Sequence, residues 1–168
     1  WFEIPGHPPV KRNYSISSAP NGEAYRISVK REPHGLASGW LHDEAKAGTN
    51  LKVAAPAGEF FLAEHTERPV VLLSGGVGLT PMVAMLEALV EADTDVPVHY
   101  IHGTHNCDTH AMRNHVRDLA TKGRAVQVTD FHQTPLGDEV KGLDYDEAGI
   151  ITDEWLVANT PVAEADYY

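Results

Sequence analysis

A glycine-rich turn near the middle of the chain has residue types that suit phosphate binding. It follows an apolar run at residues 70–73 and precedes an apolar repeat at residues 82–89 that predicts a helix. Such a turn presents backbone N–H groups at the positive end of the helix dipole, where anions bind. Glycines let the backbone approach a ligand, and Pro81 suits a first helical position. The spacing Gly-x-Gly-x-x-Pro therefore favours a pyrophosphate site, but it lacks the third glycine of the ordinary dinucleotide fingerprint.

A second candidate is the run Arg12-Asn13-Tyr14-Ser15, which we expect on a strand. Residues two apart on a strand share a face, so Arg12 and Tyr14 point the same way. A guanidinium pairs bidentately with phosphate, and a tyrosine ring stacks on a planar heterocycle. Asn13 and Ser15 point to the other face, from which a hydroxyl still reaches a ligand edge. An ordinary edge strand with a half-buried tyrosine explains the same residues.

A third candidate lies around Gly35 and Ser38, just before Trp40 and Leu41. Ser38 stands where a helix N-cap is expected, and the N–H groups after an N-cap bind small anions. A capped helix explains Ser38 equally well without a ligand.

The elements that position these residues fall into two kinds. Up to about Leu62 the chain is rich in β-formers and turn residues, which indicates an antiparallel, barrel-like part with one short helix over residues 38–45. Beyond it, buried strands alternate with helical periodicity, which predicts a parallel sheet with helices on both faces. Residues 64–69 are the expected boundary. The expected strands are 14–17, 25–31, 51–54, 70–74, 96–102, 125–129 and a start at 166, and the later helices are 81–92, 109–122 and 152–159.

Composition narrows the class of protein. The chain has 168 residues, a formal net charge of −11 and one cysteine, Cys107. This charge argues against nucleic-acid binding and against an anionic membrane surface, since both need clustered cations. One cysteine leaves no internal disulfide and no cysteine-based metal site, so a cytoplasmic location is the default. We expect no signal peptide, because the chain does not open on a charged region followed by an apolar core. The glycine turn and Glu87 interrupt the longest apolar run, which argues against a membrane span.

The ten histidines and an acidic segment raise the question of a metal site. His110 and His115 are five residues apart, whereas helical ligands are three or four apart. We therefore expect no metal ligands, and interpret the histidines as surface and packing residues. The acidic side chains lack the regular spacing of a calcium loop, so a solvated face explains them better: Asp138, Glu139, Asp144, Asp146 and Glu147.

The order of these motifs resembles the ferredoxin–NADP⁺ reductase superfamily, and the nearest likeness is to the reductase half of flavohaemoglobins. The likeness covers nearly the whole chain. It is carried by the motifs Gly-x-x-Ser-x-Trp-Leu and Gly-Gly-Val-Gly-Leu-Thr-Pro and by residues 12–18, 27–31, 40–43, 55–61, 102–106 and 110–113.

The resemblance implies a fold of the α/β plus β class. A partial antiparallel flavin-binding β-barrel (residues 1–63, without its first strands) precedes a parallel α/β domain that binds NAD(P) (residues 64–168). Both ends are truncated relative to the family, because the downstream Cys-Gly-Pro motif and the C-terminal aromatic are absent. A chain cut in this way leaves sheet edges open.

The resemblance also assigns roles to individual residues. Arg12 would bind the FAD pyrophosphate, Tyr14 would stack on the isoalloxazine, and Ser15 would bond near flavin N5. Gly35 and Ser38 would hold FAD phosphates, and Asn13 belongs to the same cofactor-binding run. The NAD(P)H loop would comprise Gly76, Val77, Gly78, Leu79, Thr80 and Pro81, with Thr80 near the nicotinamide. Tyr14, Ser15 and Thr80 are the expected catalytic residues.

By resemblance, the function is FAD-dependent transfer of electrons from NADH or NADPH to a haem. The haem would lie in a globin domain of the same parent chain and convert nitric oxide and oxygen to nitrate. One alternative is a reductase component that supplies an iron–sulfur protein or an oxygenase. Another is a non-catalytic nucleotide-binding fragment. The turn at residues 102–106 lacks the arginine that would clamp a 2′-phosphate, which favours NADH.

Overall fold

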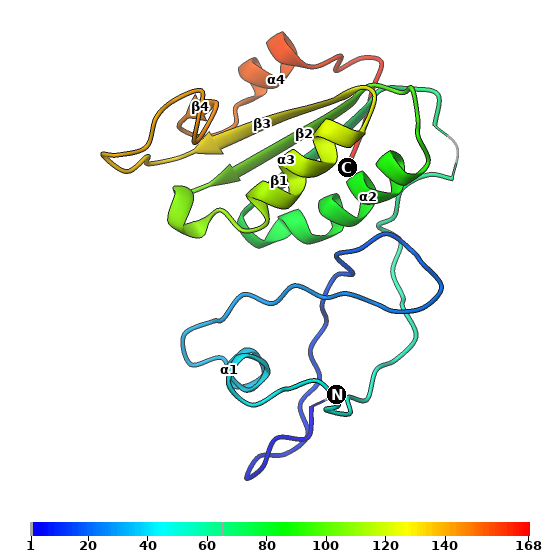
Figure 1. Cartoon of the computed structure of the whole chain (residues 1–168), viewed down its shortest axis with the longest axis vertical. Coiled ribbons are helices and arrows are strands. Elements are labelled where there is room, and N and C mark those ends of the chain that lie inside the picture. The colour runs from blue at the N-terminus through cyan, green and yellow to red at the C-terminus, as the bar shows by residue number, and fades with distance from the viewer. Residues whose placement is uncertain (1, 65) are drawn as a thin grey trace.

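A parallel β-sheet forms the centre of the C-terminal part of the chain. The computed structural model describes residues 2–64 and 66–168, and within them this sheet has five strands in the order β4-β3-β2-β1-β5 (Figure 1). Every neighbouring pair is parallel. The strands are β1 (Val70–Gly75), β2 (Val98–Thr104), β3 (Val126–His132), β4 (Glu147–Ala148) and β5 (Asp166–Tyr167).

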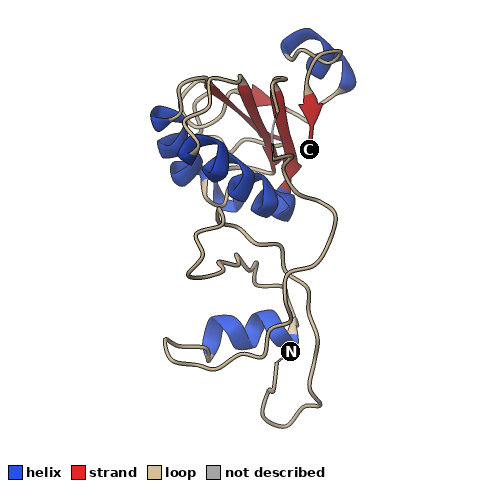
Figure 2. Ribbon diagram, turned by 90° about the vertical axis from the view of Figure 1, so that its right-hand side faces the viewer, coloured by secondary structure: helices blue, strands red, loops and turns tan. Residues whose placement is uncertain are grey.

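Helices cover both faces of this sheet, as Figure 2 shows. Successive strand residues point to opposite faces. Val70 and Leu72 therefore pack with α2 (Leu79–Glu91) and α3 (Arg113–Lys122). Val71, Ile101 and Phe131 face the other way, toward α4 (Asp153–Asn159). The parallel sheet covered on both faces is confirmed.

The expected elements of this part are confirmed with shifted ends. Strand β2 starts two residues later than expected, and β3 extends to His132. The helix expected from Thr109 begins at Arg113, because a 3₁₀ turn at Cys107–Thr109 comes first. Thr152 caps α4, and its hydroxyl accepts a hydrogen bond from the Trp155 N–H at 3.2 Å. The short strand β4 carries no alternation that would predict it.

The N-terminal part contains one helix, α1 (Leu36–Asp43), two residues earlier than expected, and long extended segments. Among residues 2–64, antiparallel pairing is limited to the isolated bridges Phe2↔Val10 and Ile16↔Ile27. An extended segment without strands on its sides has few backbone partners, and so no regular ladder forms. The expectation of continuous strands is therefore wrong at 14–17, 25–31 and 51–54.

A small apolar cluster holds the N-terminal part together. Phe2, Ile4 and Ala37 are buried in it, and Tyr14 and Trp40 pack against them. The Phe2 ring meets the Tyr14 ring at 6.2 Å and the Trp40 ring at 6.1 Å, both edge to face. Trp1 of the expected barrel range and His65 of the expected boundary lie outside the described residues.

Candidate functional site

The glycine turn lies between the carboxyl end of β1 and the start of α2. Residues Gly76–Gly78 form a 3₁₀ turn, and Gly76 has a φ of +51°, in the left-handed region that favours glycine. Residues 75–78 are exposed, and a Cβ added at Gly76 or Gly78 would meet nothing within 4 Å. The turn thus leaves open space beside bare backbone at the carboxyl edge of a parallel sheet, where nucleotides bind in α/β folds.

Helix α2 begins directly after this turn. Leu79 is buried and anchors the first turn in the core, while Thr80 and Pro81 are partly exposed. The Thr80 hydroxyl donates to the Val77 carbonyl at 3.4 Å. The expectation that Pro81 takes the first helical position is wrong, because the 3₁₀ turn already leads into helix at Leu79 and makes Pro81 the third residue. Proline is tolerated there, since first-turn N–H groups have no partner within the helix.

The expected flavin segment lies in the N-terminal part. Arg12, Asn13 and Ser15 are exposed, and Tyr14 is half-buried. The Arg12 Nη1 donates to the Lys11 carbonyl at 2.8 Å. Burial raises the pKa of Tyr14, against the opposing effect of the Arg12 charge. The segment thus offers an exposed cation beside an aromatic ring that Phe2 holds in place.

Ser38 does not cap α1. It is the third residue of the helix, and Gly35 is the N-cap residue, without a side-chain cap hydrogen bond. The Ser38 hydroxyl is buried, donates to the Gly35 carbonyl at 3.3 Å and accepts from the Glu32 N–H at 3.2 Å. The N-cap expectation is wrong, because the helix starts at Leu36, and Ser38 instead closes the loop before it. A hollow lined by Arg31, Pro33, Gly35 and Gly39 lies at this end of the helix.

The structure brings two of the three candidate segments together. The apolar cluster joins Tyr14 to Leu36 and Trp40 of α1, so the expected flavin segment and the loop around Gly35 belong to one unit. The glycine turn belongs to the sheet, and the ribbon places α1 beyond the extended segments, on the far side from the sheet (Figure 1).

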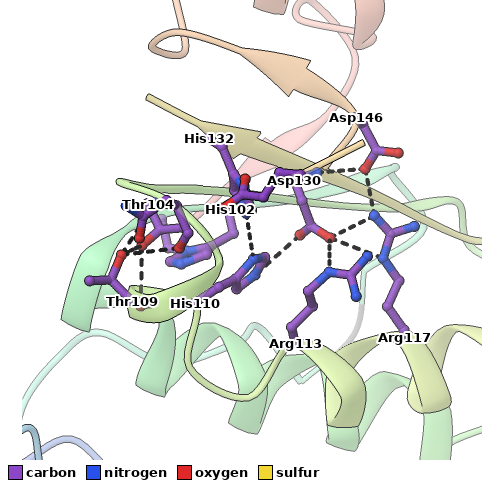
Figure 3. Close-up of polar contacts among 12 residues, drawn as sticks. His102, Thr104, Thr109, His110, Arg113, Arg117, Asp130, His132 and Asp146 are labelled. Carbon is purple, nitrogen blue, oxygen red and sulfur yellow. Dashed lines mark hydrogen bonds and ion pairs between the residues drawn. The ribbon is translucent and has the colours of Figure 1, made fainter. Parts of the chain in front are cut away.

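A buried cluster of His102, His110 and His132 lies close to the carboxyl ends of β2 and β3 (Figure 3). His110 Nδ1 lies 3.1 Å from His132 Nε2, and His102 Nδ1 lies 2.9 Å from the Ser74 hydroxyl. Burial first, and then neighbouring histidines, lower the pKa of His102 to about 4 and that of His110 to about 3. These are packing histidines, as expected for His102 and His110.

Asp130 extends this cluster toward α3. It is 1% exposed and accepts from Arg117 Nε at 3.0 Å and Nη2 at 2.6 Å. Asp146 accepts from the same guanidinium at 2.5 Å and from the Asp130 N–H at 2.8 Å (Figure 3). Burial raises the pKa of Asp130, against the effect of Arg117. These bonds fix α3 to β3 and to the segment before β4.

Sequence reasoning missed this network as a unit. His102 and Thr104 alternate at the end of one buried strand, and Asp130 and His132 alternate at the end of the next. The parallel register pairs His102 with Asp130 and Thr104 with His132. Polar residues at alternate positions after an apolar run are the signal that could have revealed it, because they share one face.

The expected solvated acidic face is wrong for Glu139. Its side chain is 3% exposed, and its two carboxylate oxygens accept from the Cys107 N–H at 2.8 Å and contact His132 Nδ1. Hydrogen bonding to Glu139, together with the charges of Glu139, Asp108 and Asp138, raises the pKa of the exposed Cys107 thiol to about 11. The turn after β2 is therefore a region of negative potential.

This environment predicts an unreactive thiol. Because the thiolate is the nucleophile, alkylation of Cys107 near neutral pH should be slow despite its exposure. The substitution Glu139→Gln removes the main source of the raised pKa, and we expect alkylation at least about tenfold faster. Timed labelling with iodoacetamide and mass spectrometry measures the rate. The remote change Glu164→Gln should leave it unchanged, and equal rates in both variants would refute the electrostatic cause.

In residues 2–64 and 66–168, no helix combines the length and apolarity needed to cross a bilayer. Over the same ranges, no group of three or more His, Cys, Asp and Glu side chains is arranged to hold a metal ion.

The parallel sheet, its order and the glycine turn before α2 define a ferredoxin reductase-like nucleotide-binding module. The chain belongs to the oxidoreductase NAD-binding domain family, whose model matches residues 72–167. The chain superposes with a TM-score of 0.80 on a crystal structure from Vibrio cholerae O1 biovar El Tor. That structure is of the flavohem-like FAD/NAD binding domain of nitric oxide dioxygenase. It is 34% identical, over 94% of this chain and 64% of that one.

Curated relatives agree with this assignment. A flavohemoprotein of Xylella fastidiosa (strain 9a5c) is 50% identical over 99% of this chain and 41% of its own length. One of Bacillus cereus (strain ATCC 10987 / NRS 248) is 43% identical over 94% of this chain and 40% of its own. The resemblance to the reductase portion of flavohaemoglobins is confirmed, and the chain spans about two fifths of these relatives.

Proposed function

We propose that these residues form the reductase module of a flavohaemoglobin-type protein, which takes electrons from NAD(P)H through FAD to a haem. The observation that carries the proposal is the exposed glycine turn between β1 and α2, which leaves open space beside its backbone at the carboxyl edge of the sheet, where dinucleotides bind in such folds. The flavohemoprotein relatives support the haem as acceptor. An iron–sulfur or oxygenase acceptor has no comparable support.

In this proposal the turn residues Gly76, Val77 and Gly78 hold the coenzyme pyrophosphate, with Leu79, Thr80 and Pro81 of α2 completing the loop. Open space beside Gly76 and Gly78 fits a phosphate chain there. The helix dipole favours its charge. Thr80, whose hydroxyl points back to the turn, would orient the nicotinamide end.

The flavin would lie against the N-terminal part. Arg12 would pair with its pyrophosphate, Tyr14 would stack on the isoalloxazine, and Ser15 would bond near N5, with Asn13 in the same run. Gly35 and the Ser38 turn would contact phosphate. The exposed guanidinium beside a ring held by Phe2 fits this cofactor. FAD, when bound, supplies a hydride acceptor that can release electrons singly, and the protein contributes by placement.

We divide the chain into a flavin domain (residues 1–63) and a nucleotide domain (residues 64–168), since the sheet starts at Val70 and the N-terminal cluster ends at Leu41. Negative potential around Cys107, after β2, disfavours a 2′-phosphate and supports NADH. The electron acceptor is a globin domain in the same chain, the overall activity is nitric oxide dioxygenation, and the location is cytoplasmic.

The test is an absorption spectrum of the complete protein that contains these residues, taken anaerobically before and after NADH. Bleaching of flavin absorption with reduction of a haem Soret band supports the proposal. Flavin absorption without a haem band would mean that the module reduces an acceptor other than haem. The absence of both chromophores, after incubation with free FAD and haem, would refute the proposed function.

Arg12 provides a narrower prediction. A bidentate, charge-assisted bond to phosphate is worth about 1.5–3 kcal/mol, so Arg12→Ala should weaken FAD binding by at least about tenfold. Fluorescence titration of the cofactor-free protein with FAD measures this. The neighbouring exposed cation offers a matched control, and Lys11→Ala should bind FAD normally. Equal affinities in the two variants would remove Arg12 from the pyrophosphate site.

A further inference from the structure

One buried carboxylate joins the two parts of the molecule. Glu87 lies in the middle of α2, with its side chain 9% exposed. Its Oε2 accepts from the Ala19 N–H at 2.9 Å, and its Oε1 accepts from Arg26 Nη2 at 2.6 Å. His115 of α3 contacts the same Oε1 through Nε2 at 2.6 Å. Two of these three partners belong to the N-terminal part, more than 60 residues away in sequence.

The N-terminal partners form a braced segment. Arg26 also donates to the Ser17 carbonyl, and the Ser17 N–H donates to the Arg26 carbonyl at 2.8 Å. The Ser17 hydroxyl lies 2.9 Å from that of Ser28, which in turn lies 3.7 Å from the Met112 sulfur. These bonds tie the two ends of residues 17–28 to each other, and Glu87 is their charged contact on the sheet-bearing part.

The charge at this position is costly to bury. Burial opposes ionisation of Glu87, but hydrogen bonds from Arg26, from the Ala19 N–H and from His115 outweigh it and hold its pKa below the usual range. Leu86 and Leu89 beside it are buried apolar residues. A buried ion pair adds little net stability over apolar packing, whereas it can specify one arrangement over others. Here the pair of Glu87 and Arg26 would specify the orientation of the N-terminal part relative to the sheet-bearing part.

The position of Glu87 connects the two candidate cofactor sites. Ser15 precedes the braced segment by two residues. Along α2, Glu87 is eight residues from Leu79, which corresponds to about 12 Å along the helix axis between the backbone of Glu87 and the residue that follows the glycine turn. A single rigid helix thus leads from the anchor to the coenzyme loop.

We propose that Glu87 is a positioning residue that sets the flavin segment relative to the coenzyme loop, through its bonds to Ala19 and Arg26. The inference rests on the proposed function and adds to it the residue that aligns the two sites. Misplacement of reacting groups by about 1 Å lowers rates by up to about 100-fold, so loss of this anchor should slow hydride transfer while leaving each site able to bind.

The experiment compares Glu87→Gln with Glu91→Gln in the complete protein. Glu91 is the exposed last residue of the same helix, so it controls for charge and helix propensity. In Glu87→Gln we expect anaerobic flavin reduction at saturating NADH to slow by at least about tenfold, with unchanged affinities for FAD and NADH. Arg26→Gln should behave similarly, and the double variant should lose less than the product of the single losses.

A second measurement needs no cofactor. Hydrogen–deuterium exchange of the peptide covering residues 17–28 should accelerate in Glu87→Gln and not in Glu91→Gln. Glutamine carries no charge and has one acceptor oxygen, so it cannot accept from both the Ala19 N–H and Arg26. Slower flavin reduction together with faster exchange supports the proposal. An unchanged rate of flavin reduction in Glu87→Gln, with normal flavin content, would overturn it. A loss of affinity for FAD or NADH as large as the loss of rate would also overturn it. Unchanged hydrogen–deuterium exchange in Glu87→Gln would also refute the role of Glu87 as an anchor. If the unmodified protein binds no cofactor, the proposed function itself fails.

Discussion

Replacing Gly76 with valine should weaken NADH binding by at least about 100-fold. Gly76 has a φ of +51°, a conformation that costs a β-branched residue about 1–3 kcal/mol. The new side chain would also occupy the open space beside the turn, where we propose that the coenzyme approaches the backbone. Fluorescence titration with NADH measures the affinity, and FAD binding in the same variant should stay unchanged because the proposed FAD site lies in the N-terminal part.

The control is a glycine of another exposed loop. Gly137 also has no atom within 4 Å of an added Cβ, so Gly137→Val should bind NADH normally. The variant Gly76→Asn separates the two causes, since asparagine tolerates the left-handed conformation but still fills space. Recovery of affinity in Gly76→Asn would assign the effect to strain. Normal NADH affinity in a folded Gly76→Val protein would show that the turn does not bind the coenzyme.

The sheet was predictable because its signals are local. Apolar runs such as residues 70–73 predict buried strands, and β1 is confirmed at Val70–Gly75. The apolar repeat over residues 82–89 predicts α2, and it is confirmed with Met82, Met85, Leu86 and Leu89 buried. Element ends were less predictable, because 3₁₀ turns before α2 and α3 change where the helical pattern starts.

The N-terminal part shows what local signals omit. Residues 25–31 have β-formers, but a strand also needs partners along its sides, and here Ile16↔Ile27 is an isolated bridge. Ser38 has the residue type of an N-cap, yet the apolar contacts of Leu36 and Ala37 start the helix earlier. At both places the tertiary contacts decided the local structure, and not the intrinsic strand or N-cap preference of the residues.

In the candidate site, too, features that are contiguous in sequence were more predictable than features that join separate elements. The glycine turn is contiguous in sequence, so a phosphate site there could be proposed before any fold was known. The histidine cluster and the Glu87 anchor join residues from separate elements, and no spacing rule links Glu87 to Ala19 or Arg26. Such contacts depend on the register of the sheet and on the placement of the two parts, which a single sequence does not encode locally.

Acid should destabilise the fold through the buried histidines. The pKa of His102 is lowered to about 4 and that of His110 to about 3, mainly by burial, against about 6.5 in an unfolded chain. Between these values the unfolded state binds more protons, so the free energy of unfolding falls as pH falls from about 6.5. His102 alone should contribute a loss of about 3 kcal/mol by pH 4.

Urea unfolding of this chain between pH 7 and pH 4 measures that loss, and His102→Gln isolates it. Glutamine keeps a polar group near the Ser74 hydroxyl but does not titrate, so the variant should be less stable at pH 7 and lose less stability on acidification. His105 is exposed in the following turn, and His105→Gln should keep the pH dependence of the unmodified chain. Parallel stability curves for His102→Gln and the unmodified chain would mean that His102 is protonated without cost, which is incompatible with its burial at the carboxyl edge of the sheet.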